Sequence, residues 1–328
     1  MTWLITGGAG YVGSHVAWAM ARAGERVAVL DDLSSGVAAR LHGDGVPLVR
    51  GSTLDRELLD RTLAGLGVTG VVHLAARKQV AESVAQPLRY YRENVHGLTV
   101  LLEAVAAAGV ERFVFSSSAA VYGTPQADAV TEDTPCRPVS PYGETKLAGE
   151  WLVRAAGAAH GLATACLRYF NVAGAGRPEL ADTAVTNVVP MMFERVSRGQ
   201  GPLVFGTDYP TPDGTCVRDY VHVADVASAH LAVARHLAGR RGAGDLTANV
   251  GTGRGVSVRE LADLVCEVTG RPDLAPVAGP RRPGDPARVV GSAARIGAEL
   301  GWRARHSVRE MVESAWEGWR LRHGAGGG

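Results

Sequence analysis

The chain begins with a short apolar run and a glycine-rich turn, Thr2-Trp-Leu-Ile-Thr6-Gly7-Gly-Ala-Gly10-Tyr-Val-Gly13. Segment 2–6 predicts a short buried strand, and apolar residues at helical spacing follow as far as Met20. The glycines between them permit a tight turn in which a pyrophosphate can approach the free N–H groups of a helix start. The stretch therefore predicts the strand, turn and helix of a dinucleotide-binding fold.

An acidic pair follows the second predicted strand. The run 26–30 ends in Asp31 and Asp32, and a carboxylate at this place can accept hydrogen bonds from both hydroxyls of an adenosine ribose. It would also repel a 2′-phosphate, and no arginine or lysine occurs between residues 31 and 36. The sequence therefore favours NAD over NADP. The alternative for the acidic pair is a solvated turn.

Strand-like and helix-like segments alternate through the first half of the chain. The further strand-like runs are 47–50, 70–74, 112–116 and 163–169, and the amphipathic stretches between them are 56–64, 87–107 and 142–159. This alternation predicts an α/β fold, a Rossmann-type doubly wound parallel sheet, with a smaller mixed α/β substrate-binding region after it. The predicted domains are 1–170, which binds NAD, and 171–328, which binds substrate and is partly interleaved with the first.

The composition is that of an ordinary globular protein. The chain has 328 residues, 46% hydrophobic and 20% charged, and its net charge of +1 gives no signature of nucleic-acid or membrane binding. No signal-peptide pattern or apolar run near the ~20 residues of a membrane span occurs, so we expect a cytoplasmic protein. The four scattered cysteines form no C-x-x-C pair, and no metal site is expected.

A tyrosine and a lysine lie four residues apart in Ser140-Pro-Tyr142-Gly-Glu-Thr-Lys146. On a helix the two side chains would share a face. A tyrosine titrates near pH ~10, so its use as a base near neutrality requires a shift of roughly three units, about 4 kcal/mol, in the direction that a neighbouring cation supplies. The alternative is a chance pair on a half-buried helix.

Polar and small residues follow several predicted strands. Ser52 and Thr53 follow the third strand, segment 73–78 the fourth, and Ser116-Ser-Ser118 the fifth. Asn94 interrupts the apolar face of the helix before the fifth strand. Since parallel sheets bind ligands at the carboxyl ends of their strands, we expect the site at this edge.

Five motifs occur together in this chain. They are Gly7/Gly10/Gly13, Ser116-Ser-Ser118-Ala-Ala-Val-Tyr-Gly123, Tyr142-x-x-x-Lys146, Arg168-Tyr-Phe-Asn171 and Gly214-Thr-Cys-Val-Arg218-Asp-Tyr-Val-His222. With them, the sequence from residue 2 to about residue 320 resembles the UDP-glucose 4-epimerases, which belong to the extended short-chain dehydrogenase/reductases. The last two motifs are the specific ones, because the superfamily shares the glycine turn and the Tyr/Lys pair.

The resemblance implies an isomerase that interconverts UDP-galactose and UDP-glucose with NAD as cofactor, by oxidation at C4, turnover of the 4-keto sugar and return of the hydride. Tyr142 matches the base that takes and returns the hydroxyl proton, which suits a phenol with a pKa near neutrality. Lys146 matches the residue that lowers this pKa and holds the nicotinamide ribose. Ser118 matches the hydroxyl that bonds the sugar O4 and bridges to the phenol.

The remaining site residues are predicted from the motifs and the resemblance. The predicted cofactor-binding residues are Gly7, Gly10, Tyr11, Val12, Gly13, Asp31, Asp32, Ser52, Thr53, Leu74, Ala75, Ala76, Lys78, Asn94, Ser116, Tyr142, Lys146 and Tyr169. The predicted substrate-binding residues are Ser118, Tyr142, Asn171, Asn187, Phe205, Arg218, Arg282, Asp285 and Val289. Of these, Arg218, Arg282 and Asp285 match residues that grip the diphosphate and the uridine ribose. The alternatives are an internal Arg218–Asp219 salt bridge and a core position for Phe205.

The chain departs from the family pattern at a few positions. Ser52 stands where the family usually has an aspartate that contacts the adenine amine, so we expect weaker retention of NAD. Ala76 replaces a glycine, and Ala120 replaces a hydroxylated residue that offers the sugar one contact. Val289 stands where many members carry a large residue beside the C2 substituent, and we hypothesise room for an N-acetyl group and turnover of UDP-N-acetylhexosamines.

The same fold also carries functions other than epimerisation. A nucleotide-sugar 4,6-dehydratase or decarboxylase needs a carboxyl group beside the catalytic hydroxyl, where this chain has Ala119 and Ala120. An epimerase of UDP-glucuronate or a UDP-pentose would keep every residue named, and a catalytically silent NAD-sensing protein is the remote alternative. The resemblance implies a homodimer formed through the helices at 87–107 and 142–159, and neither nucleic acid nor membrane as a partner.

Overall fold

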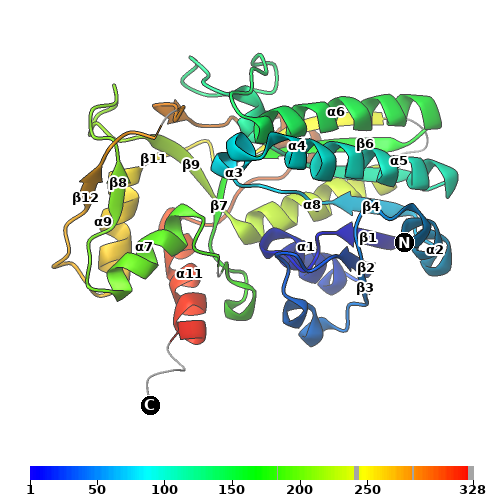
Figure 1. The fold of residues 1–328 in the computed structure, drawn as a ribbon, viewed down its shortest axis with the longest axis horizontal. Helices are drawn as coiled ribbons and strands as arrows, with labels where there is room; N and C mark the ends of the chain where they lie inside the picture. The colour runs from blue at the N-terminus through cyan, green and yellow to red at the C-terminus, as the bar shows by residue number, and fades with distance from the viewer. Residues whose placement is uncertain (183, 240–243, 283, 324–328) are drawn as a thin grey trace.

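The computed structural model describes residues 1–182, 184–239, 244–282 and 284–323. Its centre is a parallel sheet of seven strands in the order β3-β2-β1-β4-β5-β6-β10 (Figure 1). The strands are β1 (Thr2–Thr6), β2 (Arg26–Asp31), β3 (Leu48–Arg50), β4 (Gly70–His73), β5 (Arg112–Ser118), β6 (Ala163–Tyr169) and β10 (Gly244–Val250). The strand order reverses direction between β1 and β4, and in such sheets ligands bind at the carboxyl ends of the strands at this switch point.

Helices cover both faces of this sheet. One face packs against α1 (Tyr11–Arg22), α8 (Val223–Ala238) and α10 (Ala294–Leu300), and the other against α2 (Arg56–Leu66), α5 (Gly97–Ala107) and α6 (Pro141–His160). Every residue of β1 is buried, as expected of a strand covered on both faces. The predicted Rossmann-type doubly wound sheet is therefore confirmed.

The predicted strands agree with the observed ones to within a few residues. Strand β5 extends two residues beyond the predicted run 112–116, because Ser117 and Ser118 continue to pair with Arg168 and Tyr169 of β6. The catalytic candidate Ser118 is therefore the last residue of the strand. The segment 87–107 is also divided into α4 (Pro87–Tyr90), a π-helical turn η2 (Tyr91–His96) and α5.

A smaller α/β layer lies beside the carboxyl edge of the sheet (Figure 1). Its helices are α7 (Val188–Ser197), α9 (Val258–Val268) and α11 (Val308–His323), which share a second apolar core. Its strands are β7 (Asn171–Ala173), β9 (Val217–His222), β11 (Gly255–Ser257) and β13 (Arg288–Val289) in one sheet, and β8 (Leu203–Phe205) with β12 (Val277–Gly279) in another. A capping box formed by Ser257 and Glu260 opens α9.

The remaining short elements connect these layers. They are α3 (Val80–Ala85) and the 3-10 turns η1 (Ala38–Asp44), η3 (Ala119–Tyr122) and η4 (Pro178–Leu180). Helix α8 and strand β10 come from the second half of the chain yet belong to the large sheet layer, and the division at residue 170 stays a prediction. Among the described residues, no helix is both long and apolar enough to cross a membrane.

Candidate active site

The glycine turn between β1 and α1 leaves its backbone open to a ligand. Gly10 begins α1 and no side chain caps its N–H groups. Gly7 has φ of +71°, and a Cβ atom on it would lie 2.6 Å from the amide nitrogen of Ala75. A Cβ atom on Gly13 would collide with the Gly7 carbonyl oxygen. A pyrophosphate binds where the N–H groups of a helix start are uncapped and where no side chain blocks its approach to the backbone. The turn therefore fits a dinucleotide.

The acidic pair after β2 divides into two different environments. Asp31 is buried, and its carboxylate accepts hydrogen bonds from Ala9 N at 3.0 Å and Leu33 N at 2.8 Å. Burial raises the pKa of Asp31, and these two backbone hydrogen bonds oppose the rise. Asp32 is exposed and accepts from Ser34 N at 2.8 Å. The solvated-turn alternative therefore describes Asp32 only, whereas Asp31 ties β2 to the glycine turn.

The first helical residues of α1 and the residues after β3 surround this turn. Tyr11 is buried and donates its hydroxyl to the Gly174 carbonyl at 2.6 Å, while Val12 is half-buried. Ser52 is half-buried, and its hydroxyl accepts from Leu54 N at 3.2 Å. Thr53 is buried beside Gly97.

The loop after β4 lies against the glycine turn. Leu74 N donates to Thr6 O at 3.0 Å, and Leu74, Ala75 and Ala76 are all half-buried. Lys78 is exposed. The contact of Lys78 with the cofactor phosphates stays a prediction.

Asn94 joins this loop to α6. Its side chain lies in the π-helical turn η2 and is 4% exposed. It accepts from Arg77 N at 2.8 Å and donates to Arg77 O at 3.0 Å and to Thr145 Oγ1 at 3.1 Å. Since Thr145 directly precedes Lys146, Asn94 fixes the β4 loop relative to the lysine.

Helix α6 presents Tyr142 and Lys146 to the carboxyl end of β5. Ser140 caps the helix by accepting from Gly143 N at 3.2 Å, and Pro141 occupies its first position. Lys146 is buried and donates from Nζ to Ser116 O at 2.8 Å, and its Nζ lies 5.9 Å from the centre of the Tyr142 ring. The hydroxyl of Ser118 hydrogen-bonds the Tyr142 phenol.

The pKa values of this pair differ from our expectation. Burial raises the pKa of Tyr142, and the hydrogen bond with Ser118 opposes the rise. Burial also lowers the pKa of Lys146 to about 8, and the negative charge of the Glu150 carboxylate opposes this lowering. The predicted lowering of the tyrosine pKa is therefore not reached in the chain alone, because desolvation of the phenolate outweighs the nearby polar groups.

Ser116 and Tyr169 form the wall behind the pair. Ser116 Oγ lies 3.0 Å from His230 Nε2, while His230 Nδ1 lies 2.8 Å from Val226 O. Burial lowers the pKa of His230 to about 4, so the ring is neutral near pH 7. Burial also raises the pKa of Tyr169, and a hydrogen bond with Ser116 opposes this rise. The wall is therefore uncharged.

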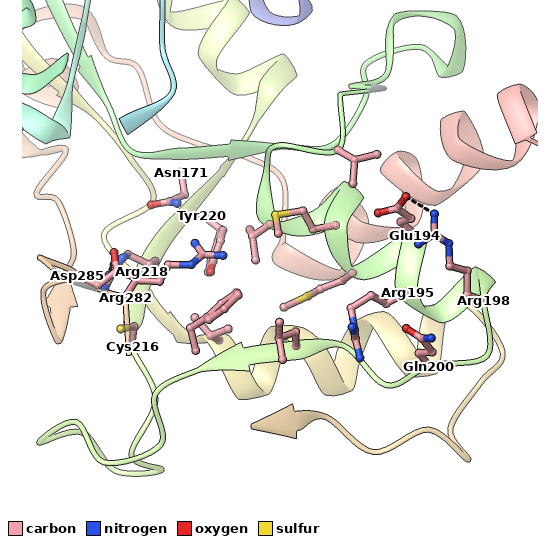
Figure 2. A pocket seen from close by; sticks show the side chains of 17 residues that line it. Asn171, Glu194, Arg195, Arg198, Gln200, Cys216, Arg218, Tyr220, Arg282 and Asp285 are labelled. Atoms are coloured by element: carbon pink, nitrogen blue, oxygen red, sulfur yellow. Dashed lines mark hydrogen bonds and ion pairs between the residues drawn. The ribbon is translucent and has the colours of Figure 1, made fainter. Parts of the chain in front are cut away.

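A cleft of about 380 Å³ opens between α7, β8 and β9 (Figure 2). Asn171, Phe205, Arg218, Arg282 and Asp285 all line it, as predicted for the substrate site. Figure 2 shows Arg218, Arg282 and Asp285 gathered at one end, where Arg218 Nη2 lies 3.6 Å from Asp285 Oδ1. The guanidinium of Arg282 lies 3.9 Å from the centre of the Phe205 ring. This end offers two cations, an aromatic face and one carboxylate.

The neighbouring residues Arg218 and Asp219 do not form the internal salt bridge that was the alternative. Asp219 is fully buried and accepts hydrogen bonds from Thr252, Gly253 and Gly291. Arg218 is thereby left to face the cleft.

Four predicted substrate residues do not line this cleft: Ser118 and Tyr142, which lie at the carboxyl end of β5, and Asn187 and Val289. Asn187 begins α7, donates to Asp182 and lines a separate small hollow beside Tyr11. Val289 is buried on β13 in a small apolar cluster that includes Val121, next to the end of β5. Their predicted contacts with substrate stay predictions.

Buried polar residues around the pair were not predicted from the sequence. Ser117 donates to Glu150 Oε1 at 2.6 Å, and Arg168 forms an ion pair with Glu150 at 2.6 Å. Glu150 follows Lys146 by four residues on α6, and this i,i+4 spacing was the available signal.

Comparison with known proteins gives a consistent result. The profile of the NAD dependent epimerase/dehydratase family matches residues 3–251. A UDP-glucose 4-epimerase of Azospirillum brasilense is 47% identical over 321 residues, which cover 96% of this chain and 91% of the relative. The crystal structure of UDP-glucose-4-epimerase from Stenotrophomonas maltophila, with bound NAD and formylated UDP-arabinopyranose, has a TM-score of 0.94 at 37% identity and 99% coverage of both chains. That of the Bifidobacterium longum UDP-glucose 4-epimerase in complex with NAD+ and UDP has a TM-score of 0.91 at 34% identity, with both chains fully covered.

Proposed function

The chain belongs to the NAD dependent epimerase/dehydratase family, and we propose that it is an isomerase that interconverts UDP-galactose and UDP-glucose. The observation that carries the proposal is the grouping of Ser118, Tyr142 and Lys146 at the carboxyl end of β5, in a chain that also has an open glycine turn and an arginine-lined cleft. One side of this group fits a dinucleotide, and the other fits a nucleotide diphosphate. The group itself is able to move one proton.

Bound NAD supplies a hydride acceptor and donor at C4 and a positive charge that favours the phenolate. Tyr142 takes the proton of the C4 hydroxyl and returns it to the opposite face of the sugar. Ser118 hydrogen-bonds both the phenol and the sugar O4. Lys146 uses one N–H for the Ser116 carbonyl, and an ammonium group has two further donors, which suit ribose hydroxyls.

The diphosphate of the substrate is proposed to bind at the cationic end of the cleft. Arg218 and Arg282 carry the planar forks that match phosphate oxygens, and Asp285 is placed to accept from ribose hydroxyls. Because the sugar has to present both faces of C4, firm contacts to UDP and loose contacts to the hexose serve the reaction. Phe205 adds an aromatic surface at the same end.

The residues that follow Ser118 at the end of β5 do not support a dehydratase or decarboxylase reaction. Ala119 and Ala120 follow Ser118 in η3, so no carboxylate is placed there for a dehydratase or decarboxylase. An epimerase of UDP-glucuronate or a UDP-pentose would need the same residues, so only assays with the different UDP-sugars distinguish these reactions. Val289 is the basis for proposing that UDP-N-acetylhexosamines are accepted as well.

We also propose that the protein is a homodimer through the helices that carry the site. Val84, Leu88, Tyr91 and Trp151 are 63%, 83%, 40% and 60% exposed, respectively, which is high for apolar side chains. They lie on α3, α4, η2 and α6, which pack together (Figure 1). A second copy of this face would bury them. The cytoplasmic location stays a prediction.

The proposed function is tested by offering UDP-galactose, UDP-N-acetylgalactosamine and UDP-glucuronate to the purified protein, with and without added NAD. We expect UDP-glucose from UDP-galactose. Activity without added NAD would mean that the protein retains its cofactor despite Ser52. Turnover of UDP-glucuronate alone would contradict the proposal, and a complete failure with UDP-N-acetylgalactosamine would contradict the role given to Val289.

A further inference from the structure

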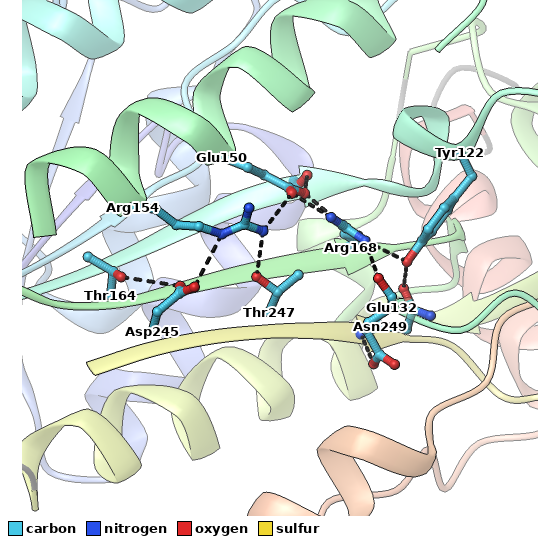
Figure 3. Close-up of polar contacts among 10 residues, drawn as sticks. Tyr122, Glu132, Glu150, Arg154, Thr164, Arg168, Asp245, Thr247 and Asn249 are labelled. Atoms are coloured by element: carbon cyan, nitrogen blue, oxygen red, sulfur yellow. Dashed lines mark hydrogen bonds and ion pairs between the residues drawn. The ribbon is translucent and has the colours of Figure 1, made fainter. Parts of the chain in front are cut away.

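Figure 3 shows a buried ion pair between Glu150 and Arg168. Glu150 of α6 is 0% exposed and Arg168 of β6 is 3% exposed. The guanidinium donates from Nε to Glu150 Oε1 at 2.8 Å and from Nη2 to Oε2 at 2.6 Å. Such a bidentate pair has one favoured geometry, because both hydrogen bonds are lost when either group rotates. It therefore fixes α6 relative to the sheet.

The Glu150–Arg168 pair also contacts residues that precede and follow Ser118 in the sequence. On the side that precedes it in the sequence, Ser117 donates to Glu150 Oε1 at 2.6 Å. On the side that follows it, Arg168 Nη1 donates to the hydroxyl of Tyr122 at 2.9 Å, and this hydroxyl donates to Asn249 Oδ1 at 2.7 Å. Ser117 is 0% exposed and Tyr122 is 1% exposed, so no water replaces these contacts without repacking.

The opposite partner, Tyr142, is placed by the same helix. Glu150 lies two turns after Tyr142 and one turn after Lys146 on α6. Near the helix start, a Cβ atom on Gly143 would lie 2.6 Å from the carbonyl oxygen of Ala120, so α6 and η3 are in close contact there. A shift of α6 along the sheet would thus separate the phenol from Ser118.

From these contacts we propose that Ser117, Tyr122, Glu150 and Arg168 are positioning residues that hold Ser118 in register with Tyr142. They touch neither substrate nor cofactor in this scheme, and they act through Ser118. The inference rests on the proposed function for its kinetic readout only. The positions of the groups are independent of which UDP-sugar is used.

The mildest test removes single hydroxyl groups. Glu150→Gln would leave Arg168 buried without its carboxylate, and Arg168→Met would leave buried Glu150 paired only with the partly exposed Arg154. Ser117→Ala deletes the bond to Glu150, and Tyr122→Phe deletes the bonds to Arg168 and Asn249. A matched control is Thr247→Val on β10, since Thr247 bonds Arg154 on the far side of the same network. We expect the control to turn over UDP-galactose like the parent.

A double-mutant cycle separates positioning from general destabilisation. If Ser117 acts through Ser118, Ser117→Ala should lower kcat roughly tenfold, the value of one hydrogen bond, with KM little changed. In a Ser118→Ala background it should have less than about a twofold effect, because the group it positions is gone. Equal losses in the two backgrounds would overturn the proposal, as would parental kcat in both Ser117→Ala and Tyr122→Phe.

A second readout does not depend on turnover. Since the Ser118 hydrogen bond lowers the pKa of Tyr142, Ser117→Ala should raise this pKa in the same direction as Ser118→Ala. Ultraviolet difference titration against Tyr142→Phe, in the chain without nucleotide, measures it. An unchanged tyrosine pKa would contradict the positioning role. Failure of the parent to epimerise UDP-galactose would instead contradict the proposed function, with the titration still valid.

Discussion

Tyr142 is a phenol whose surroundings in the chain alone keep it protonated. Burial raises its pKa, and the Ser118 hydrogen bond only partly opposes this. Lys146 is itself buried with a pKa lowered to about 8, and it directs one N–H to Ser116 O. In the mechanism that we propose, a further positive charge at the cofactor site would favour ionisation of the phenol, so proton removal would be coupled to occupation of that site.

Replacing the phenol provides a direct test at this scale. Tyr142→Phe should lower kcat for UDP-galactose by roughly 10²- to 10⁴-fold, which is the usual contribution of a general base. The amount of NAD that remains bound after gel filtration should be unchanged. Tyr90→Phe is the matched control, because it also removes a hydroxyl, bonded there to Glu82 and Gln79. Undiminished turnover by Tyr142→Phe would overturn its role as base.

At the scale of elements, the sequence pattern predicted most of the sheet. Strands β1 and β6 were predicted with their observed limits, because parallel strands covered on both faces are continuous apolar runs. The helix that carries Tyr142 and Lys146 was likewise predicted to within one residue at each end. Its proline and capping serine give a clear start signal.

Elements that depend on tertiary contacts were not predicted. Strand β10 reaches the large sheet only after a long excursion through the second layer, and no local pattern indicates its neighbour β6. The π-helical turn at Tyr91–His96 was also missed; there Asn94 bonds Arg77 and Thr145, far from it in sequence. Likewise, the sequence predicted no role for Glu150 and no partner for Arg168 of the Arg168–Asn171 motif, because their ion pair forms only when α6 and β6 come together in the fold.

At the scale of the whole molecule, four buried histidines are neutral structural groups. Burial lowers the pKa values of His15, His222 and His230 to about 4 and that of His73 to about 3. The unfolded chain binds protons at these groups at higher pH than the folded chain does. Their contribution to stability is therefore complete above pH ~6.5 and is lost as pH falls towards the folded pKa values.

The direction of these histidine pKa shifts predicts how the free energy of unfolding depends on pH. The free energy of unfolding in urea should fall between about pH 6.5 and pH 4.5, and His230→Gln should reduce the slope by up to one proton, about 1.4 kcal/mol per pH unit. The comparison uses the slope and not the absolute stability, because the variant also loses packing. Equal slopes for parent and variant would mean that His230 is not neutral in the fold.

The most direct measurement of the whole account follows the hydrogen on C4. UDP-galactose that carries deuterium at C4 is converted in ordinary water, and the position of the label in UDP-glucose is read by NMR. If Tyr142 moves only the O4 proton while the C4 hydrogen leaves and returns as hydride within one site, the deuterium should stay at C4. Loss of the label to solvent would contradict this account.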